Sequence, residues 1–453
     1  MLFRNFGLIG GIFAPQFNIM KHIFIAASIF FYAGIASSQS VTDTIEMEPG
    51  YAKQVFYQIQ TGEKHASPMS QWHIAHTTLQ MDNSIRLNHA AGVFAFLYPN
   101  GDNSAYDNFD TTGWMNWTMP YNDMKDEKLG ALNQQVDKGN QWDFSWGVYD
   151  PTSHVVKGDS LYLIVVGNGP SAKLYKFMPI KQDKNGDFIF EYGPLDAKAG
   201  SPDTIKQSNA DMGMFKYYNL NFDAQVNIES ANGDWHLNFS RYYDWVPAPG
   251  TGDLVMYPTN GIESKRGLKI AQVNGVTFED ILNAPQAFID IAESDTAIAA
   301  GHGFNLGLTR IGSDWKFFNG SSFAIVPRKN YIIAAPTATG TEYWALHFLS
   351  FGGQGTGVIT LEKSKIGALN NTDKINATKI TLYPNPSSEA IWVNAPNQIL
   401  SSIRVIDMTG RSLSELQCND NNVEVNISEL PIGQYILEAQ GNQGISRNLF
   451  IKR

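Results

Sequence analysis

The chain has 453 residues, of which 12% are aromatic, 17% are charged and 40 are glycine, and its formal net charge is −10. A charged fraction below the usual ~25%, together with many glycines and aromatic residues, is typical of an exported β protein. The negative charge and the lack of a basic run exclude nucleic acid and anionic lipid as expected partners. A single cysteine excludes a disulfide framework.

The first predicted element is a signal peptide within residues 1–38. Met20-Lys-His22 supplies a charged start, residues 23–33 are apolar, and Gly34-Ile-Ala-Ser-Ser38 offers a small-residue cleavage site. The apolar run is shorter than the ~20 residues of a membrane span, and no other segment resembles a transmembrane helix. We therefore expect Met20 to be the true start and the chain to be exported through the periplasm. A longer charged start or an N-terminal anchor are the alternatives.

The middle of the chain repeats itself. Trp72 and Trp235 lie 163 residues apart within similar strand patterns, and Tyr162 and Tyr331 lie 169 residues apart. A period this long indicates two copies of a domain, because solenoid repeats run ~20–50 residues. We predict the first copy at residues 50–196 and the second at residues 210–366. A linker follows each copy, at residues 197–209 and at residues 367–377.

Both copies have the period-two alternation and the aromatic or β-branched residues of strands. The inward face is plainest in residues 235–239, where Trp, Leu and Phe alternate with polar residues. The histidines beside the two repeated tryptophans, His73 and His236, are therefore expected to point outward. Only residues 275–296 are expected to be partly helical.

Three short motifs characterise the copies. An aromatic strand precedes Trp-x-Ile/Leu, Thr259-Asn-Gly261 lies in an extended segment, and a hairpin runs from Trp344-Ala-Leu-His-Phe348 to Leu361-Glu362. These motifs resemble the HmuY-like family of haem-binding surface proteins of Bacteroidetes, although the first copy has Leu87-Asn-His-Ala90 where Thr-Asn-Gly is expected. The resemblance implies all-β domains and, in haem-binding members, two axial His or Met ligands. The aligned motifs do not include those ligands.

A haem site needs two neutral donors across the iron and an apolar slot. His89 is followed by small residues, His302 lies between two glycines, and His154 precedes a strongly apolar strand. These three histidines are the candidate haem ligands, with an ordinary loop histidine as the alternative for each. No His-x-His or His-Glu-x-x-His spacing occurs, which argues against a zinc hydrolase.

Trp114 and Trp117 form an alternative site, a platform for a surface glycan. The acidic residues around them are Asp107, Asp110, Asp123, Asp126 and Glu127. A carboxylate pair beside aromatic rings is also what a glycosidase cleft uses, but an acidic solvated loop is the simpler interpretation. The chain has no Gly-x-Ser-x-Gly elbow, no phosphate loop and no cysteine before its tail, so we expect no catalytic residue and no enzyme.

The last predicted element covers residues 378–453, where short alternating strands are separated by proline and glycine turns. Its motif residues are Tyr383, Pro384, Asn385, Pro386, Gly410, Gly433 and Tyr435. The segment resembles the C-terminal sorting domain of type IX secretion cargo. That resemblance implies a small β-sandwich that partners the type IX secretion machinery, is removed after export, and takes no part in function.

The sequence as a whole predicts an all-β protein, with two tandem antiparallel HmuY-like domains followed by the sorting domain. We expect it outside the cell, on the outer surface or released. The leading functional prediction is capture of haem or another porphyrin, with haem or haem proteins as partners. The alternative is a glycan- or protein-binding adhesion protein with the same fold and no haem. No metal site is expected.

Overall fold

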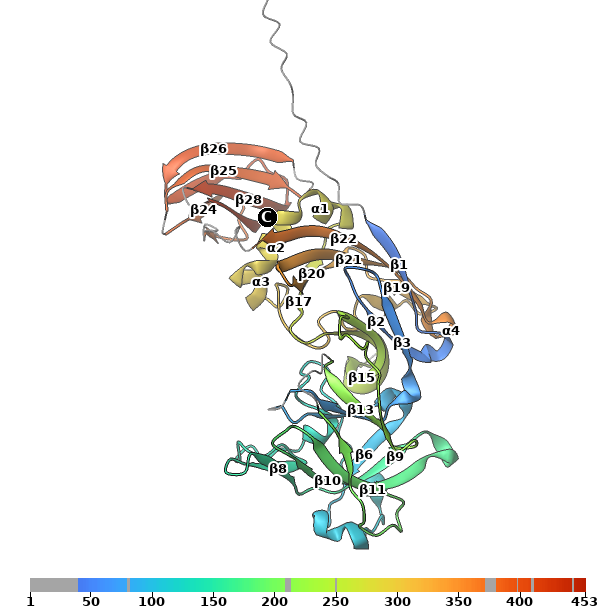
Figure 1. Cartoon of the computed structure of the whole chain (residues 1–453). Coiled ribbons are helices and arrows are strands. Elements are labelled where there is room, and N and C mark those ends of the chain that lie inside the picture. Colours follow the sequence, from blue (N-terminus) through green and yellow to red (C-terminus); the bar gives the residue numbers. More distant parts are fainter. Residues whose placement is uncertain are drawn as a thin grey trace, which may run out of the picture. The chain divides into compact units, whose positions relative to one another are not determined.

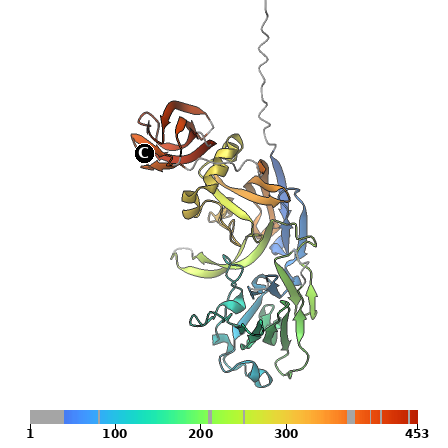
Figure 2. The same ribbon diagram turned by 60° about the vertical axis from the view of Figure 1, so that its left-hand side comes forward.

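A computed structural model describes residues 40–79, 82–207, 213–248, 251–370, 380–396, 398–408, 411–441 and 444–453. The predicted signal peptide lies outside these residues, as do residues 208–209 and 371–377 of the predicted linkers. The described chain consists mainly of antiparallel strands, which confirms the predicted all-β class (Figures 1 and 2). None of the helices in this part of the chain has the length and apolar character that crossing a bilayer requires.

The first copy is built on a seven-stranded sheet. Its strands are β6 (Val93–Leu97), β7 (Gly147–Asp150), β8 (Val155–Gly158), β9 (Tyr162–Val166), β10 (Lys173–Gln182), β11 (Phe188–Gly193) and β12 (Asp203–Ile205). The central order is β6-β9-β10-β11-β12, and β8 and β7 extend from one end of β10. The paired strands predicted to close this copy are β10 and β11, which are antiparallel neighbours.

The second copy repeats this arrangement in a five-stranded sheet with the order β1-β22-β21-β20-β17. Its strands are β1 (Val41–Glu46), β17 (Lys269–Asn274), β20 (Lys329–Thr337), β21 (Gly340–Phe351) and β22 (Val358–Asn370). A separate hairpin of β18 (Lys316–Phe318) and β19 (Phe323–Ile325) occupies the place of β7 and β8. A buried tryptophan precedes the hairpin in each copy, Trp146 in the first and Trp315 in the second, so these two residues are counterparts.

Two four-stranded sheets lie between these larger sheets, with the orders β14-β13-β4-β5 and β16-β15-β2-β3. Their strands are β2 (Lys53–Tyr57), β3 (Lys64–Pro68), β4 (Ile74–Thr77), β5 (Ile85–Leu87), β13 (Phe215–Asn219), β14 (Ala224–Val226), β15 (Leu237–Pro247) and β16 (Leu254–Ser264). Each of these sheets joins strands from both copies.

The two copies exchange their first three strands. β1, β2 and β3 belong to sheets of the second copy, and β12, β13 and β14 belong to sheets of the first. The registers match, because Tyr57 faces Leu237 just as Tyr218 faces Ile74. β1 precedes the first predicted range, 50–196, and β12 lies within the predicted linker, 197–209. Each folded unit takes strands from both copies.

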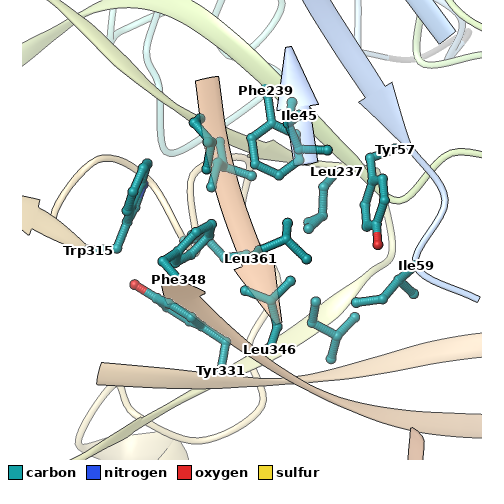
Figure 3. Packing of buried hydrophobic residues seen from close by; sticks show 14 of the residues in the cluster. Ile45, Tyr57, Ile59, Leu237, Phe239, Trp315, Tyr331, Leu346, Phe348 and Leu361 are labelled. Atoms are coloured by element: carbon teal, nitrogen blue, oxygen red, sulfur yellow. The ribbon is translucent and has the colours of Figure 1, made fainter. Parts of the chain in front are cut away.

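Three apolar clusters hold these four sheets face to face. In the second copy, Tyr57 and Phe239 pack with Tyr331 and Phe348 around a core that also contains Trp315 (Figure 3). An equivalent cluster joins the seven-stranded sheet to β4, β5 and β13. The third cluster lies between the two four-stranded sheets, where alternate residues of the same strands meet, among them Phe56 of β2 and Ala75 of β4.

Residues 275–296 are partly helical, as predicted, and these helices cover the outer face of the five-stranded sheet. They are α1 (Phe278–Asn283), α2 (Pro285–Glu293) and α3 (Asp295–Ala299), and a further short helix is α4 (Gly353–Thr356). Thr277 and Asp280 form a reciprocal capping box that starts α1. Because helices cover one face and strands the other, β20 is buried on both faces and alternates poorly in hydropathy.

His73 and His236 do not point outward as predicted. Each is buried, and its Nδ1 atom accepts a hydrogen bond from the main-chain N–H of an exchanged segment, that of Leu220 at 3.0 Å or Ile59 at 3.4 Å. Burial lowers the pKa of both histidines to about 4. The neutral imidazole is therefore a structural acceptor that fixes the exchanged strands.

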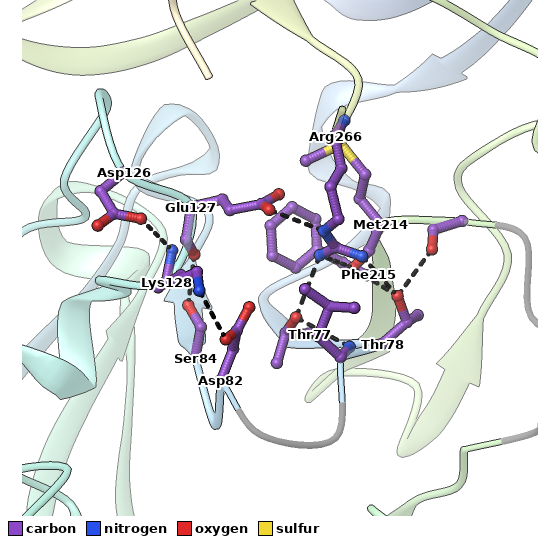
Figure 4. Close-up of polar contacts among 12 residues, drawn as sticks. Thr77, Thr78, Asp82, Ser84, Asp126, Glu127, Lys128, Met214, Phe215 and Arg266 are labelled. Carbon is purple, nitrogen blue, oxygen red and sulfur yellow. Dashed lines mark hydrogen bonds and ion pairs between the residues drawn. The ribbon is translucent and has the colours of Figure 1, made fainter. Parts of the chain in front are cut away.

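A polar contact outside the sheets also joins the copies. Arg266, after β16, donates from Nε to Glu127 Oε1 at 2.7 Å and from its terminal nitrogens to Thr77 and Thr78 (Figure 4). Glu127 lies in the loop predicted to be acidic and solvated, and this contact buries part of its side chain.

The tail forms its own β-sandwich with a separate core. Its strands are β23 (Thr381–Tyr383), β24 (Ala390–Asn394), β25 (Leu400–Asp407), β26 (Ser412–Asp420), β27 (Asn422–Asn426), β28 (Gly433–Gly441) and β29 (Gly444–Lys452). Among the described residues, no strand of the tail pairs with a strand of either copy.

Candidate functional site

The β7–β8 hairpin of the first copy borders a pocket of about 300 Å³. The lining residues are Asn83, Gln141, Trp142, Phe144, Tyr149, His154, Val156, Gln182, Asp183 and Lys184. Strand β7 supplies Tyr149, the turn between β7 and β8 supplies His154, and the end of β10 supplies Gln182. Strand pairing holds these parts together, because Gln182 lies opposite Val156 of β8.

The aromatic side of the pocket is preorganised. The rings of Trp142 and Tyr149 lie 5.3 Å apart at an angle of 35°, and the Trp142 carbonyl accepts a hydrogen bond from the Tyr149 N–H. The Tyr149 hydroxyl lies 2.7 Å from His154 Nδ1. Trp142 is 41% exposed, so one face of this aromatic pair is available to a ligand.

Polar side chains also line the pocket. Amide groups come from Asn83, Gln141 and Gln182, and the β10–β11 turn adds Asp183 and Lys184. The Asp183 carboxylate accepts hydrogen bonds from two main-chain N–H groups of its own turn. A pocket with aromatic walls and a few convergent amides is suited to a neutral, hydroxylated ligand.

The second copy has different chemistry at the equivalent place. Phe318 stands where Tyr149 stands in the first copy, Phe323 replaces Val156, and Phe351 replaces Gln182, as the strand pairings show. The rings of Phe323 and Phe351 lie 5.3 Å apart. This position is therefore an apolar patch in the second copy and a mixed aromatic and polar pocket in the first.

His89 lies in the short helix η3 (His89–Ala91) and is buried. Its Nδ1 atom lies 2.8 Å from the Val93 carbonyl, and Nε2 accepts a hydrogen bond from the Asn122 N–H at 3.3 Å. Burial lowers the pKa of His89 to about 4. Both ring nitrogens are thus engaged by the main chain, and an iron ligand would have to break one of these contacts.

The other two predicted haem ligands are exposed and lie on separate elements. His154 lines the pocket, and no hydrogen bond joins its Nε2 atom to another described residue. His302 follows α3, and its carbonyl accepts a hydrogen bond from the Gln272 N–H. Among the residues that the structure describes, no three His, Cys, Asp or Glu side chains are grouped closely enough to hold a metal ion.

The predicted glycan platform is only partly exposed. Trp114, in η5 (Trp114–Asn116), packs edge-to-face on Phe96 at 4.9 Å. Trp117 packs on Tyr98 at 5.3 Å and on Phe109 at 5.9 Å. Both rings therefore cover the outer face of the seven-stranded sheet. In the second copy, α1 and α2 cover the equivalent face.

The acidic residues near these rings are bound into turns. Asp110 accepts hydrogen bonds from Thr112, and these lower the pKa of its carboxyl group. Asp123 accepts from the main chain of Lys125 and Asp126. These two carboxylates thus have hydrogen-bond partners within their own turns.

In the tail, the predicted motif residues shape the turns of the sandwich. Asn385 donates to the Leu449 carbonyl and accepts from the Ile451 N–H. Tyr435 donates to the Pro431 carbonyl at 2.7 Å and stacks on Phe450. Gly410 lies outside the described residues.

Comparison with known proteins agrees with this sandwich. The model of the secretion system C-terminal sorting domain matches residues 381–452. The tail is a sorting domain. It indicates export through the type IX secretion machinery to the cell surface or the medium. No curated protein matches the chain.

Proposed function

We propose that this exported protein is a surface binding protein that recognises a neutral glycan at the pocket beside the β7–β8 hairpin. The observation that carries the proposal is that the Trp142–Tyr149 aromatic pair lines one pocket together with the Asn83, Gln141 and Gln182 side chains. Aromatic faces pack on the C–H faces of sugar rings, and amides exchange hydrogen bonds with sugar hydroxyls. The site therefore differs from the platform at Trp114 and Trp117 that the sequence suggested.

Replacement of Trp142 by alanine is the direct test. The Trp142→Ala variant removes one ring of the aromatic pair, so we expect glycan affinity to fall about ten- to a hundredfold, as for an aromatic anchor that the ligand buries. A glycan array probed with the secreted chain identifies the ligand, and calorimetry then measures both proteins. Trp114→Ala is the matched control and is expected to bind like the wild type. An array without any retained glycan, or equal loss in both variants, would contradict the proposal.

Haem or porphyrin capture is the second candidate, and His154 is the observation that favours it. Its imidazole lies at the pocket with Nδ1 held by Tyr149, which leaves Nε2 as a donor to iron. HmuY-like capture of this kind predicts a saturable, red-shifted Soret band on hemin titration. We expect His154→Ala to abolish that band and His302→Ala to preserve it. A broad spectrum without saturation would leave only the glycan proposal.

A further inference from the structure

A second cavity, of about 40 Å³, lies between the two four-stranded sheets. Side chains from both copies line it, including Gln54 of β2, Trp72, Ala75 of β4 and Asn238 of β15. Gln54 is 2% exposed and Asn238 is 6% exposed. The cavity thus lies where the exchanged strands of the two copies meet.

Three polar atoms of these lining residues have no hydrogen-bond partner among the described residues. They are the donors Gln54 Nε2 and Trp72 Nε1 and the acceptor Asn238 Oδ1. The Asn238 amide is held by Glu263, because its Nδ2 atom donates to Glu263 Oε2 at 2.9 Å. Buried polar atoms without partners cost stability, so each of these atoms requires one.

Comparison with the second copy shows which hydrogen-bond partner Trp72 lacks. Its counterpart in the second copy, Trp235, donates from Nε1 to Glu229 Oε2 at 2.8 Å. Both indoles belong to the cluster between the two four-stranded sheets. The first copy has Ala66 and Pro68 in the segment that corresponds to Glu229, so the carboxylate that pairs with Trp235 has no counterpart in this segment.

We propose that this cavity binds ordered water, which links Gln54, Trp72 and Asn238 across the exchanged strands. The guest must accept from two donors and donate to one acceptor, and water does both. Chloride or a carboxylate would leave Asn238 Oδ1 without a donor, and a cation would face two N–H groups and the nearby Arg86. A single water needs about 10–15 Å³, so the cavity of about 40 Å³ has room for roughly three or four waters.

The Gln54→Met variant tests this proposal, because methionine keeps the volume of the side chain and removes its amide. If a water is hydrogen-bonded to the Gln54 amide, removal of the amide removes that hydrogen bond, and we expect Tm to fall by about 2–4 °C. If the amide is unpaired, its removal raises Tm and overturns the proposal. Trp72→Phe is expected to lower Tm in the same way, while Gln58→Met, at a more exposed position of the same segment, is expected to leave it unchanged.

A crystal structure of the secreted chain supplies the direct reading. We expect a solvent peak within hydrogen-bond distance of Gln54 Nε2 and Asn238 Oδ1 in the wild type, and its loss or displacement in Gln54→Met. After a bromide soak, an anomalous peak at this position would identify an anion instead and overturn the proposal. A dry cavity in the wild-type map would also overturn it.

Discussion

Buried histidines support this fold as neutral hydrogen-bond acceptors. Burial lowers the pKa of His73, His76, His89 and His236 to about 4. In the unfolded chain the same histidines titrate near pH 6.5. Between pH 4 and pH 6.5 the unfolded chain therefore binds more protons than the folded protein. The stability that these groups contribute is complete above pH 6.5 and is lost as the pH falls toward 4.

Replacement of His73 tests this linkage. The His73→Gln variant should be less stable than the wild type at pH 7, and the difference should shrink by at most about 1.4 kcal/mol per pH unit below 6.5. Urea denaturation at pH 7, 6 and 5 measures it. Carboxyl groups with a raised pKa, such as Glu263, have the opposite effect and favour the folded protein as the pH falls. Comparing the variant with the wild type at each pH cancels this effect. A difference that stays constant from pH 7 to pH 5 would show that His73 does not titrate in this way.

Residue patterns in the sequence predicted the strands well and the burial of single residues less well. The landmarks Tyr162 and Tyr331 are buried at equivalent places, and His154 lies at the pocket. His73 and His236 were assigned to the outside because alternation places them there. In the structure both faces of these sheets are covered, so alternation separates two cores rather than a core from solvent.

At the level of elements, the exchange of strands was not predictable from the sequence. The alternation of residues in β2 is the same whether the strand pairs within its own copy or with β15. Partner choice depends on contacts that are distant in the sequence. The repeat itself was visible, and its order of strands is preserved in both copies.

β1 provides a test of the exchange, because β22 is its pairing partner among the described strands and belongs to the second copy. Ile45 is fully buried in the core of the second copy, whereas Val41 on the same strand is 49% exposed. We expect Ile45→Ala to lower the free energy of unfolding by about 2–5 kcal/mol. Val41→Ala should change it by less than about 0.5 kcal/mol. Chemical denaturation measures both, and equal small effects would contradict the pairing.

For the whole molecule, the exchange makes the two copies one folded unit. Cleavage at a protease site inserted between Gln207 and Gly213 should therefore leave the two fragments bound to each other through the four-stranded sheets. Size-exclusion chromatography under native conditions measures this. Cleavage between Asn370 and Ile380 is the matched control and should release the sorting domain, which has its own core. Fragments that separate after the first cut would refute the exchange.

The pocket beside the β7–β8 hairpin has no chemical equivalent among the described residues of the second copy. The pocket residues Tyr149 and Gln182 are replaced by Phe318 and Phe351 in the second copy, so the account predicts one ligand site per chain. Isothermal titration of the secreted chain with a glycan identified on the array tests this most directly. The expected result is a stoichiometry of one, with binding lost in Trp142→Ala. Two equivalent sites per chain, or one site that survives that replacement, would contradict the account.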